Sequence, residues 1–193
     1  MLWDTHMHTH FSGDSNADPA AMARSAIEKN LAGICITDHL DYDYPDKPDL
    51  FTIDFPQYEK GIRQLQADFS DSLNINFGIE LGLQPHLAKK HHEILQEMDF
   101  DFVIGSSHVV HGLDPYYPAY YEGRSEHAAY LEYFESILEN IAAFHEFDVY
   151  GHIDYVVRYG PEKNKNYSYD KYKDVIDEIL RQLIAHGKGI ELN

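Results

Sequence analysis

Short apolar segments with strand-like composition alternate with amphipathic helical segments along almost the whole 193-residue chain. This alternation predicts parallel strands joined by helical crossovers, the pattern of an α/β fold. No internal repeat or interdomain linker interrupts it, so we expect one domain over residues 1–193. The strand-like runs cover residues 33–37, 75–79, 102–107, 148–151 and 187–193, and the helical patterns cover residues 20–27, 58–69, 87–98, 126–144 and 172–184.

Side chains that commonly bind metal ions stand where these strand-like runs end. The carboxyl ends of the strands in a closed α/β barrel meet at one face, where active sites are built. We therefore expect residues that lie far apart in the sequence to converge in one pocket. The residues concerned are His6, His8, His39, Glu80, His108 and His152.

The opening stretch holds the densest group of these candidates. His6 and His8 follow the short apolar run of residues 1–3, and Asp14 follows six residues after His8. Side chains two residues apart point the same way at the end of a strand, so both imidazoles can grip one ion. The polar turn at Ser12 also permits Asp14 a purely local role.

The donor set predicts a multinuclear metal site. Histidine, aspartate and glutamate without thiolates suit zinc, iron or manganese. One ion needs about three protein ligands and an open position for water. Seven candidates therefore suit two or three divalent ions, with Glu80 able to bridge two of them. Such a cluster generates hydroxide from bound water and orients a phosphate, which favours hydrolysis of a phosphate ester.

The charge and composition of the chain limit the classes of molecule that it can bind. The formal net charge of −18 disfavours nucleic acid as a partner. Bound cations can nevertheless make a local site attractive to a small phosphorylated substrate. The sequence contains no apolar run of membrane-spanning length and no leader-like start, so we expect a cytoplasmic protein that does not bind a membrane. Cys35, the single cysteine, is expected to be an inert buried thiol.

The motifs, taken together, are similar to those of the polymerase and histidinol phosphatase (PHP) superfamily, and most resemble its histidinol-phosphate phosphatases. The resemblance implies a distorted (β/α)7 TIM-like barrel with a trinuclear site. It further implies hydrolysis of L-histidinol phosphate in histidine biosynthesis, with Arg158 gripping the phosphate. The motifs that carry it are Asp4-x-His6-x-His8-Thr9-x-Phe11-Ser12-x-Asp14, Thr37-Asp38-His39, Gly78-Ile79-Glu80, Gly105-Ser106-Ser107-His108, Gly151-His152-Ile153-Asp154 and Gly189-Ile190-Glu191-Leu192-Asn193.

The chain departs from the family pattern at its end. Members of the family continue past the Glu-Leu-Asn strand to a second phosphate-binding arginine and a further Asp and His that complete the metal shell. We therefore expect that a C-terminal portion, including the last strand or strands of the barrel, is missing from this sequence. If the chain truly ended at Asn193, a non-catalytic metal-binding protein would be the better interpretation.

Other interpretations stay open at this point. A PHP phosphoesterase for another small phosphate ester fits the same motifs, and a zinc amidohydrolase also begins with His-x-His. Asp38 and Asp154 are candidates to orient imidazoles, against simple turn roles. The acidic and aromatic loops at residues 41–43 and 116–117 are candidates to hold a cationic substrate group. His10 is expected behind the metal ligands or at the surface, five further histidines at the surface or at helix ends, and His91 in the core.

Overall fold

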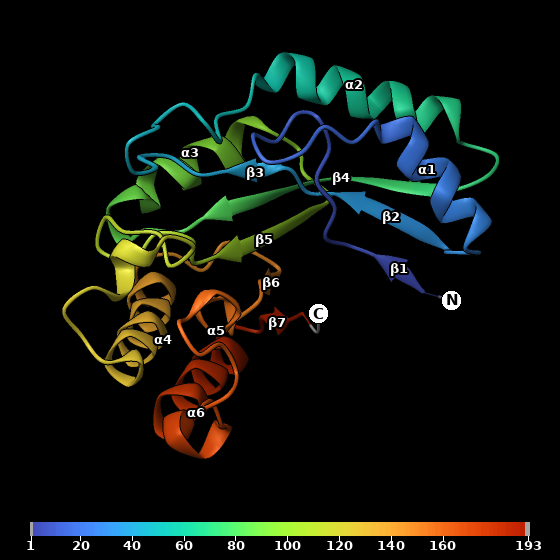
Figure 1. Cartoon of the computed structure of the whole chain (residues 1–193). Helices are drawn as coiled ribbons and strands as arrows, with labels where there is room; N and C mark the ends of the chain where they lie inside the picture. Colours follow the sequence, from blue (N-terminus) through green and yellow to red (C-terminus); the bar gives the residue numbers. More distant parts are fainter. Residues whose placement is uncertain (1, 192–193) are drawn as a thin grey trace. The chain divides into compact units, whose positions relative to one another are not determined.

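The computed structural model describes residues 2–191 of the chain (Figure 1). Residues 192–193 of the last predicted strand lie outside the described residues. The elements are β1 (Trp3–Asp4), α1 (Pro19–Glu28), β2 (Gly33–Ile36), β3 (His39–Leu40), α2 (Phe55–Asp68), β4 (Asn74–Gly82), η1 (Pro85–Leu87), α3 (Ala88–Glu97), β5 (Phe102–Ser106), η2 (Pro118–Tyr121), α4 (Glu126–Ala143), β6 (Val149–Tyr150), α5 (Tyr155–Tyr159), α6 (Tyr169–Ala185) and β7 (Gly189–Ile190).

The chain forms two compact units. Unit 1 comprises residues 1–81 and 93–104, and unit 2 comprises residues 82–92 and 105–193. The boundary therefore passes through β4, α3 and β5. Each unit is described separately below.

Unit 1 is built on parallel strands in the order β1-β2-β4, with β3 also paired to β4. Helix α1 packs against β2 and α2, and Figure 1 shows both helices along the same side of these strands. Asp18 caps α1 by accepting a hydrogen bond from the Ala20 N–H, as its position before a proline predicts. The register pairs His39 directly with Glu80, which places two predicted ligands side by side.

The core of unit 1 consists of side chains from the strands and from the inner face of α2. Ile34, Ile36 and Phe77 come from the strands, and Tyr58 and Ile62 come from α2; all five are fully buried. Cys35 is also buried and unoxidised, as expected for an inert thiol. A rigid apolar layer therefore lies behind the segments that carry the predicted ligands.

Unit 2 contains the parallel pair β6 and β7, in which Tyr150 pairs with Ile190. Helix α4 packs against α6 (Figure 1). Ser125 caps α4 by accepting a hydrogen bond from the Ala128 N–H. The core is rich in tyrosine, and the hydroxyl groups bond to backbone carbonyls: Tyr120 donates to Ala129 and Tyr133 donates to Ser107. The buried rings therefore keep hydrogen-bond partners for their hydroxyl groups.

The predicted alternation of strands and helices is confirmed. Two segments outside the predicted strands and helices also form short elements. Element η2 buries Tyr120 completely, and the segment that contains Arg158 forms the short helix α5. Among residues 2–191, no helix is both long and apolar enough to cross a membrane.

Candidate metal centre

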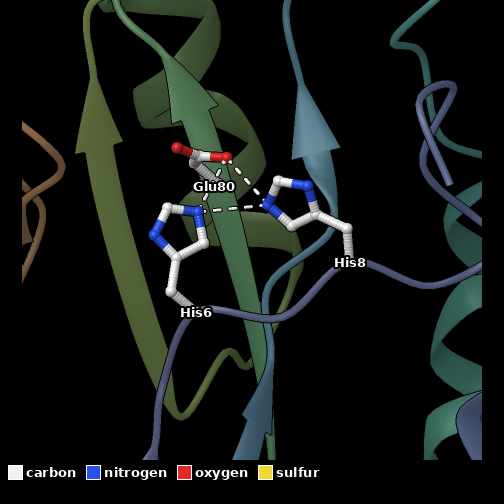
Figure 2. A group of neighbouring side chains, drawn as sticks. All are labelled: His6, His8 and Glu80. Atoms are coloured by element: carbon white, nitrogen blue, oxygen red, sulfur yellow. Dashed lines mark hydrogen bonds and ion pairs between the residues drawn. The ribbon is translucent and has the colours of Figure 1, made fainter. Parts of the chain in front are cut away.

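Three predicted ligands of unit 1 meet around one carboxylate oxygen. Figure 2 shows His6 and His8, from the segment after β1, pointing toward Glu80 on β4. The Nε2 atoms of the two histidines lie 3.1 Å apart. Glu80 Oε2 lies 3.2 Å from His6 Nε2 and 3.1 Å from His8 Nε2. The three atoms form a nearly equilateral triangle.

The size of this triangle matches one face of a metal coordination shell. Ligands bound to one zinc ion at about 2.0–2.1 Å lie about 3.3 Å apart when four are arranged tetrahedrally. The observed edges of 3.1 to 3.2 Å fit that spacing. Two neutral imidazoles and a carboxylate are also a suitable donor set for zinc, iron or manganese. The residues present therefore fit a divalent ion.

A second group in unit 1 shares His8 with the first and adds Asp14 and His39. Asp14 Oδ2 lies 3.2 Å from His8 Nδ1 and 3.7 Å from His39 Nε2. His39 Nδ1 lies 3.1 Å from Glu80 Oε2. A neutral imidazole has one free lone pair for a metal ion, so His8 can serve only one of the two groups. Glu80 Oε2 lies beside a nitrogen of both histidines of the second group, but at His39 it faces Nδ1, whereas Asp14 faces Nε2.

The metal-free cluster is held together by charge. Burial alone would lower the pKa of His8, but its hydrogen bonds to Asp14 and Glu80 outweigh that cost and raise the pKa from 6.5 to about 9. Burial would raise the pKa of Asp14, but hydrogen bonds from His8 and Ser12 hold it well below its usual range. At neutral pH His8 is therefore a cation between two carboxylates, in a position where a metal ion can replace its proton.

Asp38 does not orient an imidazole through its carboxylate. Its two oxygens instead accept hydrogen bonds from the backbone N–H of Thr9 and, at 2.8 Å, from the Thr9 hydroxyl. Both residues are fully buried. Burial raises the pKa of Asp38 and the two Thr9 bonds oppose that rise. Asp154, the other carboxylate considered for such a role, is solvent-exposed just before α5.

Unit 2 brings together two more of the predicted ligands. His108 and His152 follow β5 and β6, and their ring centroids lie 5.3 Å apart. The Tyr155 ring lies 5.6 Å from the first and 5.3 Å from the second. Arg158 lies in the last turn of α5 and is solvent-exposed. Seven predicted ligands are thus found in two groups, five in unit 1 and two in unit 2.

The burial of two carboxylates beside these residues was not predicted, although Asp41 lies in a loop that was expected to hold a cationic substrate group. Asp41 Oδ2 lies 3.0 Å from His39 Nδ1, and the alternation His39-Leu40-Asp41 was the signal that could have indicated it. Asp114 accepts hydrogen bonds from the Tyr116 N–H at 2.7 Å and from the Tyr155 hydroxyl at 3.2 Å. Asp114 stands in an irregular segment, where no periodicity predicts its burial. Both carboxylates extend the set of acidic groups near the predicted ligands.

The remaining histidines behave as predicted. His91 is fully buried, with its ring 5.5 Å from the Phe144 ring in an edge-to-face contact. His10 is exposed, as expected for a residue outside the ligand set. The five histidines expected at the surface or at helix ends are also exposed: His86, His92, His127, His145 and His186.

The family model described as "PHP domain" matches residues 4–193. The chain belongs to the PHP domain family. The match covers all seven predicted ligands. The expected family resemblance is confirmed by this match and by the relatives described next.

The PHP chain is similar to named phosphatases over its whole length. It is 33% identical to the histidinol-phosphatase of Lactococcus lactis subsp. lactis over 98% of this chain and 70% of the relative. It is 32% identical to a protein named "Probable histidinol-phosphatase" of Clostridium acetobutylicum, over 100% of this chain and 73% of the relative.

A solved structure supports the fold class directly. The crystal structure of histidinol phosphate phosphatase from Lactococcus lactis, complexed with zinc, L-histidinol and phosphate, matches this chain with a TM-score of 0.94. The two share 33% identity, and the match covers 99% of this chain and 72% of the other. The predicted fold class, an α/β fold of the PHP TIM-like type, is confirmed.

Proposed function

We propose that this chain is a metal-dependent phosphomonoesterase that hydrolyses L-histidinol phosphate to L-histidinol and phosphate in histidine biosynthesis. The similarity to the Lactococcus enzyme, whose structure contains zinc, L-histidinol and phosphate, supports this substrate. Within the chain itself, one observation carries the proposal. The His6, His8 and Glu80 ligand atoms form a triangle with edges of 3.1 to 3.2 Å, the spacing that a bound divalent ion requires.

We assign metal-binding roles to residues of both units. His6 and His8 would hold one ion together with Glu80, and Asp14 and His39 would hold a second ion that shares Glu80. Within unit 2, His108 and His152 are assigned as metal ligands. Divalent ions bound at such positions would supply a nucleophile from water at neutral pH and would neutralise charge on the phosphate. The chemistry of the donors suits zinc, iron or manganese.

The chain's own residues would bind the substrate and control protons. Arg158 is solvent-exposed, and its planar guanidinium is suited to bidentate contact with two phosphate oxygens. His8 holds a proton between Glu80 and Asp14 and would release it when an ion enters. We propose no protein side chain as general acid for the leaving alcohol.

We further propose that residues 1–193 act as one PHP domain of a cytoplasmic enzyme, with a small phosphorylated substrate and no nucleic acid or membrane partner. The net charge of −18 supports the exclusion of nucleic acid, because nothing but a local cationic site would attract phosphate groups. Fractionation of cells and the test below check these statements.

The test is phosphate release from L-histidinol phosphate by metal-free protein before and after addition of zinc, manganese or iron(II). We expect activity only with metal, and loss of that activity in excess chelator. A panel that includes a nucleoside monophosphate and a sugar phosphate separates this enzyme from a PHP phosphoesterase with another substrate. Full activity in excess chelator would refute the metal mechanism, and a higher kcat/KM for another ester would refute the substrate.

A further inference from the structure

Three separate segments of unit 1 carry the ligands of the metal-binding cluster. His6 and His8 lie after β1, His39 begins β3, and Glu80 lies within β4. Only the β3 and β4 segments are joined as neighbouring strands, with His39 paired to Glu80. The segment after β1 has left its strand before it reaches the histidines. Something other than strand pairing must therefore hold His6 and His8 in place.

Reciprocal bonds between Met7 and Thr37 supply part of that hold. The Thr37 N–H donates to the Met7 carbonyl at 2.9 Å, and the Met7 N–H donates to the Thr37 hydroxyl at 3.0 Å. Thr37 is fully buried. These bonds fix the backbone at Met7, between the two histidines. These two bonds do not fix the segment that follows His8.

The Asp38 carboxylate holds the backbone immediately after His8 in place. It accepts hydrogen bonds from both the backbone N–H and the hydroxyl of Thr9, the residue that follows His8. Asp38 itself precedes His39, and its carbonyl accepts a bond from the Glu80 N–H at 3.1 Å. One residue thus touches all three ligand-bearing segments: Thr9 through its side chain, His39 through the chain, and Glu80 through its carbonyl.

Because this contact is buried, breaking one of its hydrogen bonds would cost free energy that water could not restore. Asp38 and Thr9 are both inaccessible to solvent, so water cannot replace either partner. The Tyr58 hydroxyl accepts a weak hydrogen bond from the Asp38 N–H at 3.4 Å and donates a hydrogen bond to the Gly78 carbonyl at 2.8 Å. A buried charged acceptor that uses both oxygens on one residue holds that residue strongly.

We propose that Asp38 is a positioning residue that clamps Thr9 and so holds the imidazoles of His8 and His39 at the spacing a shared metal centre requires. The proposal rests on the metal-binding role of these residues given above. It assigns Asp38 to the backbone that carries the ligands, in place of the imidazole contact expected from its position beside His39. The Asp38–Thr9 pair is called the Thr9 clamp below.

The test compares three variants with the full chain. Thr9→Val keeps the shape of the side chain and removes its hydroxyl donor, whereas Thr9→Ser keeps the donor. Asp38→Asn keeps the shape of the carboxylate but leaves one oxygen to accept two donors. Asp101→Asn is the matched control, because Asp101 also accepts a bond from a backbone N–H, that of Phe77 at 2.8 Å, and is exposed.

Two measurements separate positioning from general stability. Zinc affinity is measured by competition with a chromophoric chelator, and the visible absorption of the cobalt-loaded protein reports the geometry of the bound ion. We expect Thr9→Val and Asp38→Asn to weaken zinc binding by about 10- to 100-fold, as changes behind metal ligands typically do. The cobalt spectrum of both variants should change. Thr9→Ser and Asp101→Asn should match the wild type in both measurements.

The outcomes are decisive in either direction. A merely structural role would lower the unfolding midpoint of the metal-free variants but leave the zinc affinity and cobalt spectrum of the folded protein unchanged, which would overturn the proposal. If Thr9→Val does not fold, Asp38→Asn decides by the same criteria. A wild-type protein that binds zinc but does not hydrolyse L-histidinol phosphate would refute the proposed substrate and leave the Thr9 clamp supported. A wild-type protein that binds no zinc would refute both.

Discussion

Replacing Glu80 by glutamine is the sharpest test of the metal-binding cluster. Glu80 is fully buried, and its Oε2 lies within 3.2 Å of a nitrogen of His6 and of His8. The substitution keeps the size of the side chain and removes the charge. Because the carboxylate lies beside nitrogens of His6, His8 and His39, we expect glutamine to weaken metal binding more than the loss of any single imidazole.

The size of the effect follows from the loss of one partner of a buried charge. The hydrogen bonds to Asp14 and Glu80 raise the pKa of His8 from 6.5 to about 9 against the cost of burial, so both carboxylates stabilise a positive charge at this position. Removing one partner of a buried charge pair costs about 3–5 kcal/mol. We therefore expect Glu80→Gln to weaken the binding of a divalent ion by at least about 100-fold.

The assay is a zinc titration of Glu80→Gln in competition with a chromophoric chelator, alongside the wild type. Glu59→Gln is the matched control, because Glu59 is a partly exposed glutamate of unit 1 whose salt-bridge partner is Arg63 on the same helix. Far-UV circular dichroism of the metal-free proteins checks that all three are folded. A zinc affinity for Glu80→Gln within about threefold of the wild type would refute the reasoning that Glu80 is a shared ligand.

Three further outcomes are expected. Zinc binding at pH 7.5 should release about one proton, because His8 is protonated below its pKa of about 9, and the zinc affinity should rise with pH up to about 9 and then level off. Calorimetry in buffers of different ionisation enthalpy measures the proton release. A binding enthalpy that does not depend on the buffer would contradict it. Arg158→Met should raise KM for L-histidinol phosphate by at least about tenfold with zinc content unchanged, whereas Arg181→Met, on the exposed face of α6, should not; steady-state kinetics and metal analysis decide. Tyr150→Phe should lower the free energy of unfolding by about 1–2 kcal/mol in urea denaturation, because it removes a buried bond of 2.6 Å to the Ser107 hydroxyl; an unchanged midpoint would show that this bond contributes nothing.

The positions of the predicted ligands could be inferred from the sequence because each breaks a local rule. Glu80 is a charge inside an apolar run, and a buried charge needs a partner. The histidines stand where strand-like runs end. These signals depend only on neighbouring residues, so they could be recognised without any knowledge of the fold. His39 is the exception in its element, because it begins the short strand β3, which was not predicted.

The contacts between segments could not be predicted in the same way. Asp38 stands beside His39, and that adjacency suggested an imidazole partner, but its actual partner is Thr9, 29 residues away. The burial of Asp41 depends on how the segment after β3 folds back, with the Asp41 N–H donating to the Phe51 carbonyl, and an alternation of three residues is too short to predict it. The short helix α5 was missed because five residues are too few to show a helical repeat.

The ligand Glu80 and the positioning residue Asp38 together explain how acidic side chains can be buried in this folded protein. A carboxylate such as Glu80 is costly to bury unless a positive charge lies beside it. In the metal-free protein the His8 proton supplies that charge, and the Thr9 clamp keeps His8 close enough to do so. A divalent ion in the same place would replace the proton and interact more strongly with the same oxygen. Folding and metal binding therefore depend on one carboxylate, and whatever holds His8 against Glu80 contributes to both.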